Sequence, residues 1–330
     1  RSRSKLGHQE QEYVVASQVH TDLDNLLIAI RDKNKSKYDA EKELDALLKR
    51  AEIANLLDAG VLEKEALIYD ELGMSEVANQ KYEDLFLFDS GNYSIKALEQ
   101  YCQVQFHKLK QDLVGLEGHD KTVIIQNYVA NTELLMLAGE NSSRLNIVAN
   151  AYKQAANCID DHSLKIDYLR KSFENYGKAL MVSKDKYDGH YLNALSNMIY
   201  VGIFLEDLKD EALIKRITKN KLFKKLTNME KFLNDFIKEL DEFDKADLDI
   251  SVLIGMTELR YALMLIKAKN VEESERDILK RYGEIFKQLY SPRYINIEIS
   301  QIEFFQQYVK NKKVLESLEH IKSELKKYLN

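Results

Sequence analysis

The sequence contains a single proline, Pro292, among 330 residues, and only 12 glycines. Turns between strands and irregular loops depend on these two residue types, so their scarcity argues against a β-rich or loop-rich protein. Hydrophobic residues make up 45% of the chain, which is enough for a continuous core. We therefore expect an all-α protein.

Cysteine is almost as rare, with only Cys102 and Cys158 in the chain. Two distant cysteines do not support a disulfide scaffold or a four-ligand zinc site. Each is expected to serve as a small core residue. This pattern predicts no metal and no cofactor, and it fits a reducing, cytoplasmic setting.

Long hydrophobic runs are also missing. No uninterrupted apolar stretch approaches the length needed to cross a bilayer, and residues 1–5 lack the hydrophobic segment of a signal peptide. We therefore expect no membrane partner. Because the first residue is not methionine, we interpret the sequence as a trimmed chain or a piece of a longer protein.

The chain has no excess of positive charge, since 48 Lys and Arg face 54 Asp and Glu for a formal net charge of -6. Proteins that bind nucleic acid usually present a broad positive field to the phosphates. A nucleic-acid partner is therefore not expected.

The clearest pattern that is present lies in residues 62–90, where two short amphipathic segments flank a turn at residues 73–75. Apolar and small residues recur every three or four positions, which places them on one face of each helix. A hairpin of this size cannot bury such faces alone, so we expect neighbours of the same kind. The inward residues are Leu62, Ala66, Tyr69, Leu72, Ala78, Tyr82, Leu85 and Phe86, and the outward face carries Glu63, Leu67, Asp70 and Glu71.

Similar helical patterns continue along the chain. Residues 10–31 and 38–57 predict an N-terminal helical pair, and Pro292 is expected to separate two C-terminal helices. The last helix carries an apolar stripe, which either caps the stack or allows self-association with a second chain. The stripe on this last helix, residues 312–329, is Val314, Leu318, Ile321, Leu325 and Tyr328. The other predicted helices are 93–113, 123–137, 144–159, 164–182, 191–205, 250–269, 271–290 and 293–310.

The charge pattern changes after residue 206. Residues 215–231 are strongly basic and residues 239–249 are strongly acidic, so we predict a subdomain junction here, with both blocks as solvated faces or as a docking segment. The expected organisation is an N-terminal helical hairpin (1–58), a repeat region (59–206) and a C-terminal helical subdomain with a capping helix (207–330).

Two sets of residues share a repeated spacing: Ala66, Tyr69, Gly73, Ala78, Tyr82 and Leu85, and then Ala149, Tyr152, Ser172, Tyr176 and Ala179. At these positions the chain resembles the tetratricopeptide repeat (TPR), a helix-turn-helix unit defined by small and aromatic residues, over about half its length. The resemblance implies a right-handed α-solenoid whose concave face binds proteins or peptides. Leu85 and Ser90 depart from the usual small residue and proline of the family.

Residues 144–157, 168–180 and 187–198 also look like the divergent repeat regions of large bacterial signalling and defence proteins, where they accompany caspase-like or other effector domains. This second resemblance rests on the general pattern of residues and not on any catalytic motif. It implies a sensing or scaffolding region that passes on a conformational signal.

Sequence signatures of catalysis are missing from the chain. It contains no phosphate-binding glycine loop, no His-Glu-x-x-His motif, no nucleophile elbow and no Cys-x-x-Cys pair. Cys158 lies four positions before His162, with Asp160 and Asp161 between them. A thiolate–base pair or a metal cluster is conceivable there, but we interpret these residues as structural.

Asparagine pairs give the sharper indication of binding. In Asn127/Asn131, Asn146/Asn150 and Asn193/Asn197 the two residues are four positions apart, so each pair lies on one helical face. A carboxamide offers donors and an acceptor, which match the N–H and C=O groups of an extended peptide. The alternative is that these side chains face solvent or bond locally. The predicted binding residues are Asn127, Asn131, Asn146, Asn150, Lys153, Asn193, Asn197 and Tyr200.

The sequence therefore predicts a non-catalytic scaffold that binds a protein or peptide through a TPR-like solenoid. Two alternatives stay open: a regulatory or sensor region of a larger bacterial effector, and an all-helical enzyme.

Overall fold

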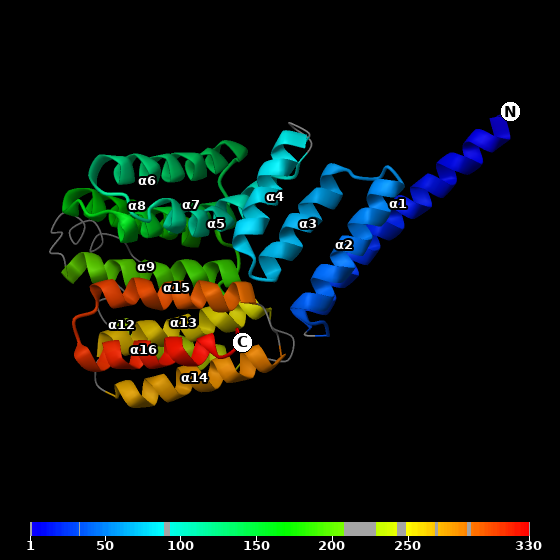
Figure 1. The fold of residues 1–330 in the computed structure, drawn as a ribbon. Helices are drawn as coiled ribbons and strands as arrows, with labels where there is room; N and C mark the ends of the chain where they lie inside the picture. The colour runs from blue at the N-terminus through cyan, green and yellow to red at the C-terminus, as the bar shows by residue number, and fades with distance from the viewer. Residues whose placement is uncertain are drawn as a thin grey trace. The chain divides into compact units, whose positions relative to one another are not determined.

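The computed structural model describes residues 2–32, 34–88, 93–207, 229–242, 249–267, 270–288 and 292–329. These residues form α-helices and one short 3₁₀ helix, with no strand among them, which confirms the all-α prediction (Figure 1). Contacts between Cα atoms divide the chain into two compact units. Unit 1 comprises Arg1–Lys108 and Gln288–Asn296, and unit 2 comprises Leu109–Lys287 and Ile297–Asn330. These boundaries differ from the three segments suggested by the sequence.

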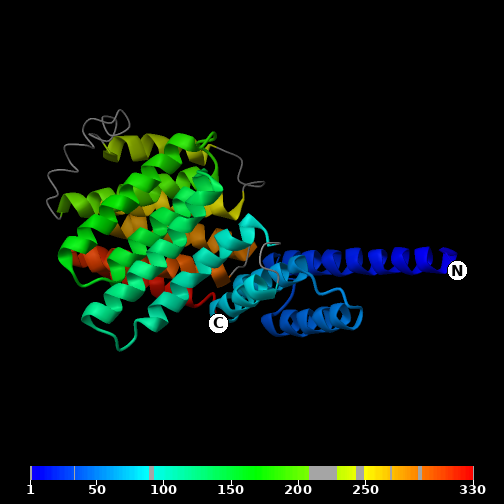
Figure 2. The same ribbon diagram turned by 90° about the horizontal axis from the view of Figure 1, so that it is seen from above.

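Unit 1 begins with a long helix. Figure 2 shows its N-terminal part extending past the neighbouring helix of the same unit. Three of the following helices have side-chain caps: Ser36 Oγ accepts a hydrogen bond from Asp39 N, Asp58 Oδ1 accepts one from Val61 N, and Ser94 Oγ accepts one from Ala97 N. The helices are α1 (Ser2–Arg31), α2 (Lys37–Ile53), α3 (Ala59–Glu71), α4 (Ser75–Phe88) and most of α5 (Ile95–Asp112).

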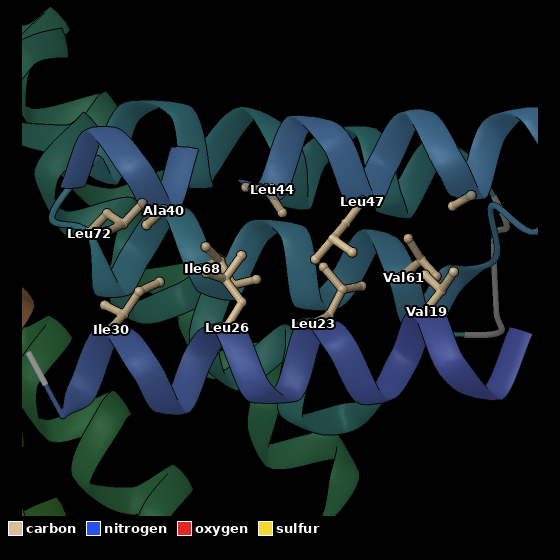
Figure 3. Close-up of a cluster of buried hydrophobic side chains, with 11 residues drawn as sticks. Val19, Leu23, Leu26, Ile30, Ala40, Leu44, Leu47, Val61, Ile68 and Leu72 are labelled. Carbon is tan, nitrogen blue, oxygen red and sulfur yellow. The ribbon is translucent and has the colours of Figure 1, made fainter. Parts of the chain in front are cut away.

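The first core of unit 1 joins α1, α2 and α3. Figure 3 shows α1 and α2 facing each other with side chains of α3 between them. A fully buried Leu, Ile or Val side chain contributes about 1.5–3 kcal/mol relative to an exposed one, so this cluster is a major source of stability for the unit. Its members are Val19, Leu23, Leu26, Ile30, Ala40, Leu44, Leu47, Ala51, Val61, Ile68 and Leu72.

The second core of unit 1 confirms the predicted helical hairpin over residues 62–88, whereas residues 89 and 90 of that prediction lie outside the described residues. Ala66 of α3 and Ala78 of α4 are fully buried, and their small size lets the two helices approach closely. Tyr82 and Leu85 fill the adjoining space, and the cluster continues to Ala97 and Val104 on α5. Helix α3 therefore packs against α1 and α2 on one side and against α4 and α5 on the other.

One face of this hairpin was predicted wrongly. Asp70 and Glu71, expected to be exposed, are buried in unit 1. Arg293, from the C-terminal segment that belongs to this unit, lies with its Nε 3.0 Å from Asp70 Oδ2 and its Nη1 3.5 Å from Glu71 Oε1. Arg31 Nη2 also donates a hydrogen bond to Glu71, at 2.7 Å. Charge pairing with residues distant in sequence thus allows these two carboxylates to be buried.

The described residues of unit 2 form α-helices and the one 3₁₀ helix. Consecutive helices pack together from α6 to α9, and α13 packs against both α9 and α12 (Figure 1). The elements are α6 (Gly118–Glu133), η1 (Leu134–Ala138), α7 (Ser142–Cys158), α8 (His162–Val182), α9 (Gly189–Asp207), α12 (Met229–Asp241), α13 (Ile250–Lys267), α14 (Val271–Gln288), α15 (Pro292–Tyr308) and α16 (Lys312–Lys326), of which Gln288 and the first turn of α15 belong to unit 1.

The centre of unit 2 is formed by α9 and its neighbours. Helix α9 is strongly enclosed, and every residue from 194 to 201 is buried. Phe204 stacks on Tyr308 with ring centroids 4.8 Å apart, and Tyr200 meets Phe305 edge-to-face at 4.6 Å. Aromatic contacts therefore join α9 to α15 in the core of this unit.

Helix α12 was not predicted, because its residues straddle the basic and acidic blocks. Leu233, Phe236 and Leu240 are spaced by three and four positions and are buried, so the helical signal was present in the sequence. The described part of the acidic block is also not simply solvated. Asp241 Oδ2 lies 2.6 Å from Nη2 of the buried Arg260. Residues 215–228 of the basic block lie outside the described part of the chain.

The apolar stripe of α16 is covered within unit 2. Val314, Leu318, Ile321 and Leu325 are buried, and Tyr328 packs against Phe286 with ring centroids 5.6 Å apart. Self-association through this stripe is therefore not supported, because the same chain already occupies it. Among the described residues, no helix has both the length and the apolar composition needed to cross a membrane.

Candidate functional site

The polar residues predicted to face a partner fall into an exposed group and an interior group, both in unit 2. Asn127 and Asn131 are exposed on α6. The others lie on α7 and α9, which pack against each other. Asn150 and Asn193 are partly exposed. The remaining residues are buried: Asn146, Lys153, Asn197 and Tyr200.

The buried residues bond to their own chain and do not form an exposed ladder. Lys153 Nζ donates hydrogen bonds to Asn197 Oδ1 and to Gln301 Oε1, each at 2.6 Å. Asn146 Nδ2 donates to the carbonyl oxygen of His190 at 2.8 Å. The Tyr200 hydroxyl donates to the carbonyl oxygen of Glu258. Helical spacing placed these side chains on common faces correctly, but those faces point into unit 2.

Two buried carboxyl groups complete this interior, and sequence reasoning missed both. Ser196 Oγ donates a hydrogen bond to Glu258 Oε2 at 2.7 Å, and the Tyr282 hydroxyl donates to Glu298 Oε2. Both glutamates are almost fully buried. We use the name Lys153 network for Lys153, Ser196, Asn197, Glu258, Tyr282, Glu298 and Gln301, which come from α7, α9, α13, α14 and α15.

Burial dominates the protonation of this network. It raises the pKa of Glu258 to about 7, although the Ser196 hydrogen bond and the Lys153 charge act against it. Burial and the neighbouring Glu258 raise the pKa of Glu298 well above its usual range. Burial lowers the pKa of Lys153 to about 8, while the charges of the two glutamates oppose that change. Protonation near neutral pH therefore decides the charge inside unit 2.

The sequence did carry a signal for these residues. Glu258 is a lone carboxyl in the apolar segment of α13, and Glu298 and Gln301 share a face of α15 with the buried Phe305. Charged residues are almost never fully buried without a partner, so an acidic side chain on an apolar helical face predicts a buried polar contact. Which helix supplies the partner depends on the tertiary fold.

The Cys158–His162 segment has a structural role in the described residues. Asp161 Oδ1 accepts a hydrogen bond from Leu164 N at 2.8 Å and caps α8. Asp160 pairs with Lys121 at 2.8 Å. Burial raises the pKa of the Cys158 thiol. Throughout the described part of the chain, no group of three His, Cys, Asp or Glu is arranged to hold a metal ion.

No protein-family model matches this sequence, and no curated protein or solved structure is significantly similar to it. The resemblance to tetratricopeptide repeats therefore rests on the residue pattern of the chain itself.

Proposed function

We propose that this protein is a divergent TPR-like helical-repeat module that binds an extended protein or peptide segment, and that α6 and η1 present the binding face. The close packing of α3 with α4 and of α7 with α8, at the two places where the repeat pattern is recognisable, supports the repeat assignment. A right-handed α-solenoid is the arrangement that belongs to this proposal.

The observation that carries the proposal is the exposed face of α6. Asn127 and Asn131 are exposed on it, and neither has a hydrogen-bond partner among the described residues. Each carboxamide can both donate and accept, so each can bond to a peptide group of a partner. The inner face of α6 carries Ile125, Tyr128, Val129 and Thr132, which are buried.

The spacing of the two asparagines suits an extended chain. Residues four apart on an α-helix are separated by about 6 Å along the axis. Side chains on one face of a strand repeat about every 6.6–6.8 Å. Because the two repeats nearly agree, Asn127 and Asn131 can bond to successive peptide groups that face α6.

Exposed apolar side chains flank the asparagines. Val123 precedes them on α6, and Leu134 and Leu137 follow on η1, where Leu137 is 85% exposed. Burying such side chains releases about 25 cal/mol for each Å² of apolar surface removed from water. Carboxamides between apolar contacts fix the position of a peptide backbone while the flanks supply affinity.

The proposal is tested by selecting binders for the full chain from a random-peptide library and measuring the affinity of a synthetic binder by fluorescence polarisation. We expect saturable binding of peptides that carry apolar side chains and no recurring need for a basic or acidic terminus. A selection that returns no saturable binder, or binders whose affinity is insensitive to changes on α6, would reject it.

A further inference from the structure

Among the described residues, the interior of unit 2 holds two buried carboxyl groups and one buried ammonium group, placed on three different helices. Lys153 lies on α7, Glu258 on α13 and Glu298 on α15. The hydrogen bonds of Lys153 Nζ go to the amide oxygens of Asn197 and Gln301 and not to a carboxylate of the described residues. One positive charge can balance only one ionised carboxylate, so the enclosed group of three is neutral only when the other carboxyl keeps its proton.

The buried Oε1 of Glu298, which has no hydrogen-bond partner, marks this glutamate as the group that keeps its proton. Its Oε2 accepts from the Tyr282 hydroxyl, while its Oε1 is buried with no hydrogen-bond partner. An ionised carboxylate in a protein interior needs several donors to offset the loss of water. A protonated carboxyl needs fewer, so this environment favours the acid form.

We propose that the Lys153 network is a pH-sensitive switch. When Glu298 is protonated, the network holds α15 against α7 and α14, which we call the closed form. When that proton is lost, α15 is released, which we call the open form. The Lys153–Gln301 and Tyr282–Glu298 hydrogen bonds stabilise the closed form. When Glu298 ionises, its second negative charge is uncompensated, and water entering beside α15 is the available source of solvation. This inference concerns unit 2 alone and stands independently of the proposed binding face.

Other titratable groups face the carboxyl pair from every packed helix: Lys153 on α7, Tyr176 on α8, Tyr200 on α9, Tyr261 on α13 and Tyr282 on α14. Burial raises the pKa of all four tyrosines well above the usual value of 10.0, so they stay protonated near neutral pH. Arg260 bonds instead to Asp241 and Asp277. The two carboxyls and Lys153 therefore set the response.

The direction follows from proton linkage. The pKa of both carboxyls is higher in the closed form than the ordinary value of 4.5, so the closed form binds more protons. The stabilisation of the closed form by the two carboxyls is complete below their ordinary pKa of 4.5 and is lost as the pH rises through their raised pKa values. Burial lowers the pKa of Lys153 from 10.5 to about 8, so the contribution of Lys153 to the stability of the closed form is lost as the pH falls through about 8. Between about pH 5 and pH 7 the carboxyls act alone, and rising pH favours opening.

The test is hydrogen exchange of α15 amides in the full chain between about pH 5.5 and pH 7.5, corrected for the intrinsic exchange rate. We expect protection to fall as pH rises, by up to about tenfold per pH unit for one linked proton. Protection that is independent of pH in the wild-type protein overturns the proposal, whatever the behaviour of any variant.

Variants assign the effect to Glu298. Glu298→Gln keeps the size of the side chain and removes its titration, so its protection should vary less steeply with pH than that of the wild type. Glu303→Gln is the matched control, because it removes a partly exposed carboxylate of α15 that pairs with Lys110 at 3.0 Å. The control should keep the wild-type slope. A Glu298→Gln protein with the wild-type slope contradicts the proposal, and if it fails to fold, Glu258→Gln supplies the same comparison.

Discussion

Arg293 Nε lies 3.0 Å from Asp70 Oδ2 in the interior of unit 1, although the two residues are far apart in the sequence. The guanidinium also donates to Gln100 Oε1 and Gln103 Oε1, at 2.7 and 2.8 Å. Burial raises the pKa of Asp70, and the charge of Arg293 opposes that rise. One arginine, whose side chain is only 12% exposed, thus ties Gln288–Asn296 to the hairpin of α3 and α4 and to α5.

Arg293→Met should destabilise the protein by about 3–5 kcal/mol, because it leaves Asp70 without its charge partner in the interior. The measurement is urea unfolding followed by circular dichroism at neutral pH. Arg293→Lys keeps the positive charge but loses the forked geometry, so it should cost less. A methionine variant within about 0.5 kcal/mol of the wild type would show that this contact has no structural role.

Gly73→Ala should destabilise unit 1 more than Gly115→Ala destabilises unit 2. Both glycines have positive φ, at +72° and +78°, so each substitution costs about 1–2 kcal/mol in backbone conformation. Only at Gly73 would the new Cβ meet a neighbour, 2.9 Å from Pro292 Cβ. Thermal unfolding of both variants measures the difference. Equal losses would mean that the Gly73–Pro292 approach is not tight in solution.

Helical periodicity predicted much of this fold. The pattern at Ala66, Ala78, Tyr82 and Leu85 placed those residues in a shared core, where the structure has them. The same periodicity does not predict which face of a helix is buried when neighbouring segments cover two of its sides. The pattern therefore predicts a solvent-facing Asp70, because the partner Arg293 comes from a distant segment of the chain.

The candidate site shows the same limit. Spacing predicts that Asn146 shares a helical face with Asn150, and Asn193 with Asn197, but it gives no reason to bring Gln301 of α15 against Lys153. Long-range pairing depends on how helices stack, which local sequence does not encode directly. By contrast, the exposure of Asn127 and Asn131 agrees with the amphipathic pattern of α6.

Lys153→Met should be tolerated better in acid than in base. Methionine removes the buried ammonium, and at low pH Glu258 and Glu298 can both stay neutral without it. As pH rises past about 7, the raised pKa of Glu258, the variant must either ionise that carboxyl without a counter-charge or hold its proton at a growing cost. Urea unfolding at about pH 5.5 and pH 8.5 should show a larger loss at the higher pH. A loss that does not change with pH would contradict the charge balance described for the network.

Leu137→Ser should weaken peptide binding without destabilising the fold, because this side chain is 85% exposed at the end of the α6 face. Met181→Ser is the matched control, since Met181 on α8 is 82% exposed. Titration of a selected peptide should show a several-fold weaker affinity for the first variant only. Equal effects of the two substitutions would place the apolar contact elsewhere.

The binding face on α6 is tested most directly by changing Asn127 and Asn131 together to alanine and measuring the affinity of a selected peptide by fluorescence polarisation. Asn175→Ala serves as the control, because Asn175 is a partly exposed asparagine of α8 whose side chain bonds to its own helix at the Lys171 carbonyl oxygen. Each hydrogen bond contributes about 0.5–1.5 kcal/mol, so the double variant should bind about tenfold or more weakly. Unchanged affinity of a folded Asn127/Asn131 double variant, equal to that of the Asn175 control, would contradict the account.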